Sequence, residues 1–246
     1  MPKQRADRLV VAQGLAPSRE RARALILAGR VIGDDDQRID KAGELLPSTT
    51  VLRLRGGLDH PYVSRGGVKL AGALDDFRVD PTGRIAADFG ASTGGFTDCL
   101  LQRGAARVHA IDVGYGQLHP TLRSDPRVRV RERTNARYLA ADSLGEPVDL
   151  VVIDASFIGL SKLLPAAYEV LADEGEVIAL VKPQFEVGRE RVGRGGVVRD
   201  PAARTDAIAQ AEDAAVGVGF AALGARDCRL PGPKGNREAF LHLRRG

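Results

Sequence analysis

The chain has 246 residues, 43% of them hydrophobic, which is enough for an α/β core and a small second domain. Its formal net charge of +4 is a modest bias toward polyanions, concentrated in residues 1–30, where seven basic residues stand against two acidic ones. Two cysteines outside any CxxC pattern and four scattered histidines indicate neither a disulfide framework nor a metal site. The N-terminus lacks the apolar segment of a signal peptide, and no apolar run approaches the ~18–20 residues that span a bilayer. We therefore expect a cytoplasmic protein that binds no metal and acts away from membranes.

The N-terminal part of the chain is predicted to form a small α+β module. The apolar run Leu9–Val11 favours a first helix, which ends at Gly14. Ser18 is a favourable N-cap for a second helix, and Gly29 is placed to end it. Two short strands around a polar turn are then predicted, over residues 30–40 and 49–55.

Basic side chains gather around the second predicted helix. Arg19, Arg23 and Arg30 are spaced i, i+4 and i+11, with Arg21 to one side, which predicts a broad guanidinium face. Composition alone leaves open that these charges only solvate the helix. The segments "SRERARALILAGRV" and "DKAGELL" resemble an S4 RNA-binding domain, which implies a face that positions structured RNA through its phosphates. The RNA-binding residues implied in this module are Lys3, Arg5, Arg8, Arg19, Arg21, Arg23, Arg30 and Lys41.

A glycine-rich stretch with one proline separates this module from the rest of the chain. After it, residues 68–77 favour a helix, and apolar strands then alternate with helical patterns. This alternation predicts a mostly parallel, doubly wound sheet, whose ligands bind at the carboxyl ends of the strands. The predicted domain boundaries are 1–58 for the RNA-binding module, 59–67 for a linker and 68–246 for the larger domain.

The stretch "DFGASTGG" follows the first strand of the larger domain, where glycines allow a sharp turn and a close approach to a ligand. A dinucleotide site would need a second glycine where Ser92 stands, so a ligand without a pyrophosphate fits better. S-adenosylmethionine is such a ligand: Asp88 can accept from its amino group, and Asp112, after the second strand, can accept from both ribose hydroxyls. A purely structural turn is the alternative. The expected cofactor-binding residues are Asp88, Gly90, Ser92, Thr93, Gly94, Gly95, Phe96, Asp112, Val113, Asn135, Ala136 and Asp154.

Four charged residues stand at strand ends or at the opening of the large domain: Lys69, Asp154, Lys182 and Glu238. Each alone is ordinary. The combination "VSRGGVKL … DFGASTGGFTDCLL … VVIDASFI … LVKPQFEVG … GPKGNREAFL" resembles the TlyA-type ribosomal RNA ribose methyltransferases, also called haemolysins, whose catalytic half is similar to the RrmJ/FtsJ methyltransferases. The resemblance implies a Rossmann-like class I fold with a mostly parallel seven-stranded sheet and an antiparallel last strand. It also implies that the four residues form the family's Lys-Asp-Lys-Glu catalytic tetrad.

The implied activity is S-adenosylmethionine-dependent methylation of a cytidine 2′-hydroxyl in ribosomal RNA. Lys182 would orient or deprotonate the hydroxyl, while Asp154 and Glu238 would hold the ammonium groups. Lysine suits this task because a guanidinium keeps its proton. We expect a monomer whose partners are ribosomal RNA and ribosomal subunits. Only six residues follow Phe240, which resembles the short family form that acts on the large subunit; action on the small subunit as well stays open.

Three further residues are expected to contact RNA: Arg65 of the predicted linker, and Phe157 and Arg189 of the larger domain. Phe157 would stack on the cofactor or on an extruded base, with a core position as the alternative. Residues 185–201, rich in arginine and glycine, would form a mobile basic lid, with ordinary disorder as the alternative. Two other functions compete with methylation: a pore-forming, membrane-lytic protein, and a non-catalytic RNA-binding assembly factor.

Overall fold

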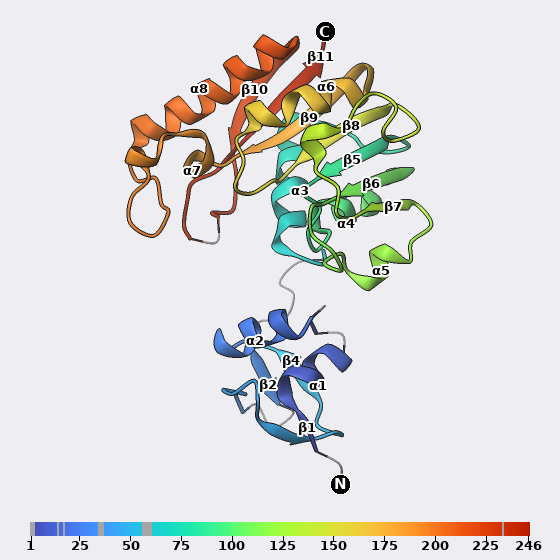
Figure 1. Ribbon diagram of the computed structural model, residues 1–246, viewed down its shortest axis with the longest axis vertical. Helices are drawn as coiled ribbons and strands as arrows, with labels where there is room; N and C mark the ends of the chain where they lie inside the picture. Colours follow the sequence, from blue (N-terminus) through green and yellow to red (C-terminus); the bar gives the residue numbers. More distant parts are fainter. Residues whose placement is uncertain (1–2, 14, 17, 34–36, 56–60, 233) are drawn as a thin grey trace. The chain divides into compact units, whose positions relative to one another are not determined.

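The computed structural model describes the chain apart from residues 1–2, 14, 17, 34–36, 56–60 and 233. The chain divides into two compact units (Figure 1). Unit 1 contains residues 1–61 and 117–120, and unit 2 contains residues 62–116 and 121–246. The predicted linker boundaries stay a prediction, because part of that segment lies outside the described residues.

Unit 1 packs two helices against two small strand pairs (Figure 1). The Ser18 hydroxyl accepts from the Arg21 amide at 3.2 Å, as expected for an N-cap, and Gly29 at φ +67° ends the second helix. The elements are α1 (Ala6–Ala12), α2 (Arg19–Leu27), β1 (Lys3–Arg5) paired antiparallel with β3 (Leu45–Pro47), and β2 (Val31–Gly33) paired antiparallel with β4 (Leu52–Leu54).

Two details of unit 1 differ from the sequence prediction. The predicted strands over 30–40 and 49–55 shrink to β2 and β4, and the β1–β3 pair was not predicted. Both strands of that pair are three residues long and largely polar or exposed, so they carry no alternating pattern. The expected end of the first helix at Gly14 lies outside the described residues.

Unit 2 is built on one seven-stranded sheet in the order β10-β11-β9-β8-β5-β6-β7. The pairs from β9 to β7 are parallel, and β11 is antiparallel to both β9 and β10. Parallel strands covered on both faces are expected to be apolar throughout, and β5 and β8 are almost wholly buried. The strands are β5 (Ile85–Phe89), β6 (Arg107–Ile111), β7 (Val128–Arg131), β8 (Val148–Ile153), β9 (Leu171–Val181), β10 (Phe220–Asp227) and β11 (Ala239–Arg245).

Helices cover both faces of this sheet (Figure 1). Residues of α6 and α8 join a core cluster with alternate residues of β8, β9 and β11. Phe240 and His242 of β11 face the other side, where they contact Phe96 of α4 and Phe77 of α3. The helices are α3 (Arg65–Phe77), α4 (Gly95–Gln102), α5 (Pro120–Arg123), α6 (Leu164–Val170), α7 (Pro183–Glu186) and α8 (Pro201–Val218), with 3₁₀ turns at Ala136–Tyr138, Leu160–Lys162 and Arg189–Arg191.

Helix α3 begins at Arg65, three residues before the predicted start. The glycines that suggest a linker by composition lie in its first turn, where the chain is tightly packed. A Cβ on Gly67 would lie 2.3 Å from Cγ of Tyr62, and a Cβ on Gly95 would lie 2.2 Å from Oγ of Ser64. Glycine here permits a close approach of α3 to α4, as it does elsewhere when two backbones meet.

Residues 185–201 are packed against the N-terminal half of α8, a helix that was not predicted. Val187 packs with Ala203 and Ala207 of α8, and Val192 and Val198 pack against the same cluster. Arg191 pairs with Asp206 at 2.6 Å. The role of this segment as a lid over RNA stays a prediction.

Candidate active site

Lys69 and Glu238 form a buried ion pair at the carboxyl edge of the sheet in unit 2. Lys69 lies in α3, and Glu238 immediately precedes β11. The distance from Nζ of Lys69 to Oε2 of Glu238 is 2.5 Å, and the two residues are only 8% and 2% exposed. Charges this deep are tolerated when an opposite charge offsets their loss of hydration. The pair therefore fixes an ammonium group of α3 against the sheet edge.

Lys182 and Asp154 form a second pair on neighbouring strand ends. Asp154 directly follows β8, and Lys182 directly follows β9. Nζ of Lys182 lies 2.6 Å from Oδ1 of Asp154, and it also donates to Oγ of Ser156 at 3.0 Å. Lys182 is 8% exposed, whereas Ser156 is exposed. This ammonium group is thus oriented by acceptors of two residues, Asp154 and Ser156, close to the surface of the site.

The two pairs lie at the same edge because β11 runs antiparallel to β9. The register pairs Ala239 with Val181, which places Glu238 beside Lys182. Burial raises the pKa of the Cys228 thiol, and Lys69, Glu238 and Asp154 all act on it electrostatically. The half-buried Cys228 thiol is therefore affected by members of both pairs.

The glycine turn after β5 is held by neighbouring backbone. Gly90 and Gly94 have φ of +90° and +94°, a conformation that glycine adopts at little cost, and Ser92 also has a positive φ of +48°. A Cβ on Gly90 would lie 3.0 Å from the Asp154 carbonyl oxygen. Packing therefore also favours glycine at position 90, because the end of β5 lies close to the end of β8. This is in addition to the expected role of Gly90 at a ligand.

Asp88, the fourth residue of β5, is buried with one unpartnered oxygen. Its Oδ2 accepts from the Thr97 amide at 2.9 Å and from the Thr97 hydroxyl at 2.7 Å. Its Oδ1 has no hydrogen-bond partner in the part of the chain that the structure describes. Burial, helped by the negative charge of the nearby Asp154, raises the pKa of the Asp88 carboxyl to about 7, although the hydrogen bonds from Thr97 act in the opposite direction. Such a carboxyl is poised to gain from a cation or a hydrogen-bond donor.

Asp112 lies one residue after β6 and holds the glycine turn in place. Its Oδ2 accepts from the Ser92 amide at 2.8 Å, and its Oδ1 accepts from the Gly114 amide at 2.6 Å. A carboxylate can accept about four hydrogen bonds, so it retains acceptor capacity for two hydroxyls. The neighbouring Val113 is 67% exposed.

The other residues expected at the cofactor lie in two environments. Strand β7 ends at Arg131, and Asn135 caps the 3₁₀ turn Ala136–Tyr138 by accepting from the Arg137 amide at 3.1 Å. Asn135 is exposed, and Thr93 is partly exposed in the turn. Ala136 and Phe96 are 8% and 3% exposed and take part in core packing.

Phe157 is 91% exposed and has a φ of +66°, so the alternative of a core position is wrong. Its ring centroid lies 5.4 Å from that of Phe185, which follows Lys182 closely along the chain. A bulky residue held in the left-handed region is strained and marks a position worth testing for function.

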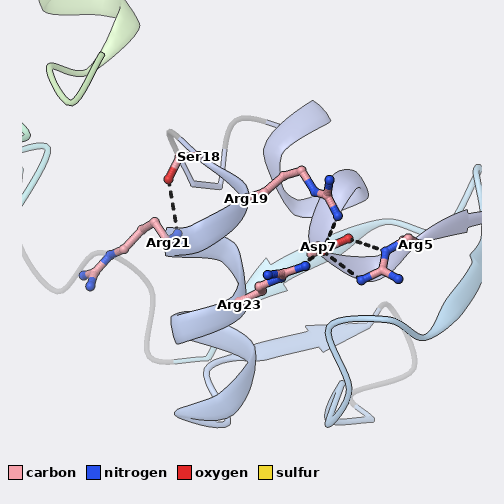
Figure 2. A network of polar contacts seen from close by, with 6 residues as sticks. All are labelled: Arg5, Asp7, Ser18, Arg19, Arg21 and Arg23. Atoms are coloured by element: carbon pink, nitrogen blue, oxygen red, sulfur yellow. Dashed lines mark hydrogen bonds and ion pairs between the residues drawn. The ribbon is translucent and has the colours of Figure 1, made fainter. Parts of the chain in front are cut away.

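The basic residues expected at RNA fall into separate places. In unit 1, Arg5, Arg19 and Arg23 converge on Asp7, whereas Arg21 extends away from this cluster (Figure 2). Arg30 follows α2, which ends at Leu27, so the predicted helical spacing holds for Arg19 and Arg23 and not for Arg30. Lys3, Arg8 and Lys41 of unit 1, and Arg65 and Arg189 of unit 2, are exposed.

The FtsJ-like methyltransferase family matches residues 62–245. The chain belongs to this family. A relative from Mycobacterium tuberculosis, named 16S/23S rRNA (cytidine-2'-O)-methyltransferase TlyA, is 48% identical over 240 residues, which are 98% of this chain and 89% of the relative. A solved structure from Streptococcus thermophilus, named "Putative hemolysin", has 43% identity and a TM-score of 0.77 and covers 100% of this chain and 89% of that one.

The fold is the Rossmann-like fold of class I methyltransferases. An S-adenosylmethionine-dependent methyltransferase from Mesorhizobium loti shares it with a TM-score of 0.56 at 15% identity, over 74% of this chain and all of that one. The expected seven-stranded sheet with an antiparallel last strand is confirmed. Among the described residues, no group of histidines, cysteines and acids could hold a metal ion, and none of the helices is long and apolar enough to cross a membrane.

Sequence reasoning missed the roles of three polar residues, two in the candidate active site and one in unit 1. Ser156 beside Lys182 stands in "DASF", where its hydroxyl gave no separate signal. Thr97, which donates twice to Asp88, lies nine residues away on α4. Asp7 entered the sequence analysis only as one of two acidic residues in the segment 1–30, and it is completely buried.

Proposed function

We propose that this protein transfers a methyl group from S-adenosylmethionine to the 2′-hydroxyl of a cytidine in ribosomal RNA. One observation carries the proposal: two lysine–carboxylate pairs, Lys69–Glu238 and Lys182–Asp154, meet at the sheet edge beside the glycine turn. The relative from Mycobacterium tuberculosis supports the nature of the substrate. Ribosomal RNA as substrate makes the cytoplasm the proposed place of action.

The residues at the glycine turn fit the cofactor. The unpartnered Oδ1 of Asp88 suits the amino group, and Asp112 suits the ribose hydroxyls. When bound, S-adenosylmethionine supplies an electrophilic methyl group on a sulfonium. Ser92, Thr93 and Gly94 form the turn against which the cofactor would lie, while Val113, Asn135 and Ala136 belong to the segments that follow β6 and β7.

Lys182 is the group best placed to act on the hydroxyl. It is the lysine whose acceptors include an exposed residue, Ser156, so a hydroxyl can reach it from the surface. In its amine form Lys182 accepts the hydroxyl proton, and Asp154 stabilises the ammonium that results. The oxygen, once aimed and stripped of its proton, would form a bond to the methyl carbon as the bond from that carbon to the sulfonium sulfur breaks, with S-adenosylhomocysteine as the leaving group.

The more buried pair plays a supporting part. Lys69 and Glu238 lie beside Lys182 and Asp154 and keep a second ammonium group in a fixed place in the low-dielectric edge of the sheet. A fixed positive charge here stabilises the oxygen as its negative charge develops. Phe157, exposed next to Ser156, would stack on the extruded base.

The test is mass spectrometry of nucleosides from ribosomal RNA incubated with the protein and deuterium-labelled S-adenosylmethionine. Labelled 2′-O-methylcytidine at one position, formed by wild type and not by Lys182→Ala, is the expected result. Cofactor binding by calorimetry is the control for the variant. Retained cofactor and RNA binding with no transfer by wild type would replace the proposal with a non-catalytic assembly factor. Leakage of liposomes in place of transfer would favour a membrane-lytic protein.

A further inference from the structure

A completely buried aspartate lies among three arginines in unit 1. Asp7, the second residue of α1, has no exposed surface. Its Oδ1 lies 3.1 Å from Nε of Arg5, and its Oδ2 lies 3.0 Å from a terminal nitrogen of Arg19 and 3.3 Å from Nε of Arg23 (Figure 2). One side chain of β1 and two of α2 are thus joined by a residue of α1.

The cluster requires Asp7 to be ionised. The hydrogen bonds from Arg5 hold the pKa of the Asp7 carboxyl well below its usual range, and Arg19 lowers it further against the effect of burial. Three guanidinium groups around one carboxylate leave a surplus of two positive charges. Because removing a carboxylate from water is costly, the burial of Asp7 is offset by these three partners.

The arginines remain available to a ligand although they are anchored. Their side chains are 39%, 46% and 54% exposed for Arg5, Arg19 and Arg23. Arg23 contacts Asp7 through Nε, so the N–H donors of its two terminal amino groups are not used in that contact. Arg21 lies two positions from Arg19 and from Arg23 along α2, and its side chain extends away from the cluster (Figure 2).

We propose that Asp7 is a positioning residue that holds Arg5, Arg19 and Arg23 as a preformed cradle for phosphates of the RNA backbone. This deepens the proposed function and rests on it. Planar guanidinium groups bind phosphate in two-point contacts, and a group already fixed in place loses less side-chain entropy on binding. Asp7 itself touches no RNA and acts through its partners. Arg21 lies outside the cradle.

Asp7→Asn distinguishes RNA binding by positioned arginines from RNA binding that depends only on the total charge of the protein. The substitution raises the net charge by one, so a protein that binds RNA only through total charge would bind at least as tightly. The cradle predicts the opposite, a loss of about tenfold in affinity for ribosomal RNA fragments and a shallower dependence of log affinity on log salt by about one. The matched control is Asp40→Asn, the same change at a 66% exposed acid that pairs with Arg38 at 2.7 Å. Its affinity should stay within about twofold of wild type.

Affinity of the full-length variants is measured by filter binding at several salt concentrations, with circular dichroism and thermal melting as checks of folding. Equal or tighter binding by folded Asp7→Asn overturns the cradle. If Asp7→Asn unfolds unit 1, Arg19→Lys and Arg23→Lys decide the question, because they keep the charge and lose the fork geometry. Each should bind severalfold more weakly than the control Arg38→Lys, and equal binding overturns the cradle. Absence of RNA binding by wild type would instead refute the proposed function.

Discussion

The two charged clusters of this chain use opposite arrangements. At the sheet edge each ammonium group faces one carboxylate, and the Lys69 and Lys182 side chains are only 9% and 10% exposed. In unit 1 one buried carboxylate faces three guanidinium groups that are about half exposed. Balanced, largely buried pairs suit groups that move a proton, and surplus charge at a surface suits a polyanion. A catalytic cluster and an RNA-binding cluster therefore differ in the ratio of basic to acidic groups and in the use of lysine or arginine. The number of basic residues is less informative.

The largest effect is expected from Lys182. Lys182→Ala should lower the rate of methyl transfer about 10³-fold, because the group that accepts the proton is lost. Lys182→Arg should be nearly as poor, since a guanidinium keeps its proton. Single-turnover transfer of labelled methyl groups measures the rate, and calorimetry should show cofactor affinity within about twofold of wild type. Substantial activity in Lys182→Arg would show that charge alone is sufficient at this position.

Glu238 tests the balance of the buried pair. Glu238→Gln should leave the Lys69 ammonium unpaired, lowering activity about 10²-fold and the free energy of unfolding of unit 2 by about 3 kcal/mol. Asp227→Asn removes a carboxylate that is 62% exposed and pairs with Arg204, and it should cost less than about 0.5 kcal/mol. Denaturant unfolding followed by fluorescence or circular dichroism compares them. Equal stability of the two variants would contradict burial as the source of the difference.

Phe157 tests whether an exposed ring contributes to the reaction without contributing to stability. Phe157→Ala should lower kcat/KM for RNA about tenfold through lost stacking and leave the melting temperature unchanged. Phe96→Ala is the matched control, since its ring is 3% exposed and its loss should cost about 3 kcal/mol. If the melting temperature of Phe157→Ala were as low as that of Phe96→Ala, Phe157 would have a structural role and the prediction would be wrong.

The smallest effect concerns pH. The pKa of the Asp88 carboxyl is raised to about 7 by burial, so the native state keeps its proton at a pH where the unfolded chain has lost it. The free energy of unfolding should therefore fall as pH rises from about 4 to about 7. The cofactor's positively charged amino group favours the ionised form, so affinity should rise roughly fivefold between about pH 6 and about pH 7. Calorimetry in two buffers should detect proton release on binding, and Asp88→Asn should abolish it.

The sequence was most informative about unit 2, where strand ends converge. Asp154 and Lys182 directly follow apolar runs, and parallel strands bring such ends to one edge. The place of Glu238 came from the resemblance to a family with an antiparallel last strand, because periodicity does not reveal strand direction. Helix α8 had signals that were overlooked: Asp200 caps it, Pro201 opens it, and alanines recur every four residues from Ala203.

Unit 1 shows why other features escaped prediction. Asp7 lies on a short helix among Ala6, Leu9 and Val10, where polarity normally indicates an exposed position. Its burial depends on Arg19 and Arg23, which arrive from another helix, so no local pattern encodes it. In the same way, glycines at positions 66, 67 and 95 suggest a linker and a ligand turn, and their close packing appears only when α3 and α4 meet.

Single-turnover methylation of ribosomal RNA, measured as a function of RNA concentration, tests the division of labour most directly. For Lys182→Ala the rate at saturating RNA should fall about 10³-fold with the half-saturating concentration nearly unchanged. For Asp7→Asn the half-saturating concentration should rise about tenfold with the saturating rate preserved. The reverse pattern, weak binding in Lys182→Ala or a lost saturating rate in Asp7→Asn, would contradict the separation of buried, balanced pairs from the half-exposed cradle.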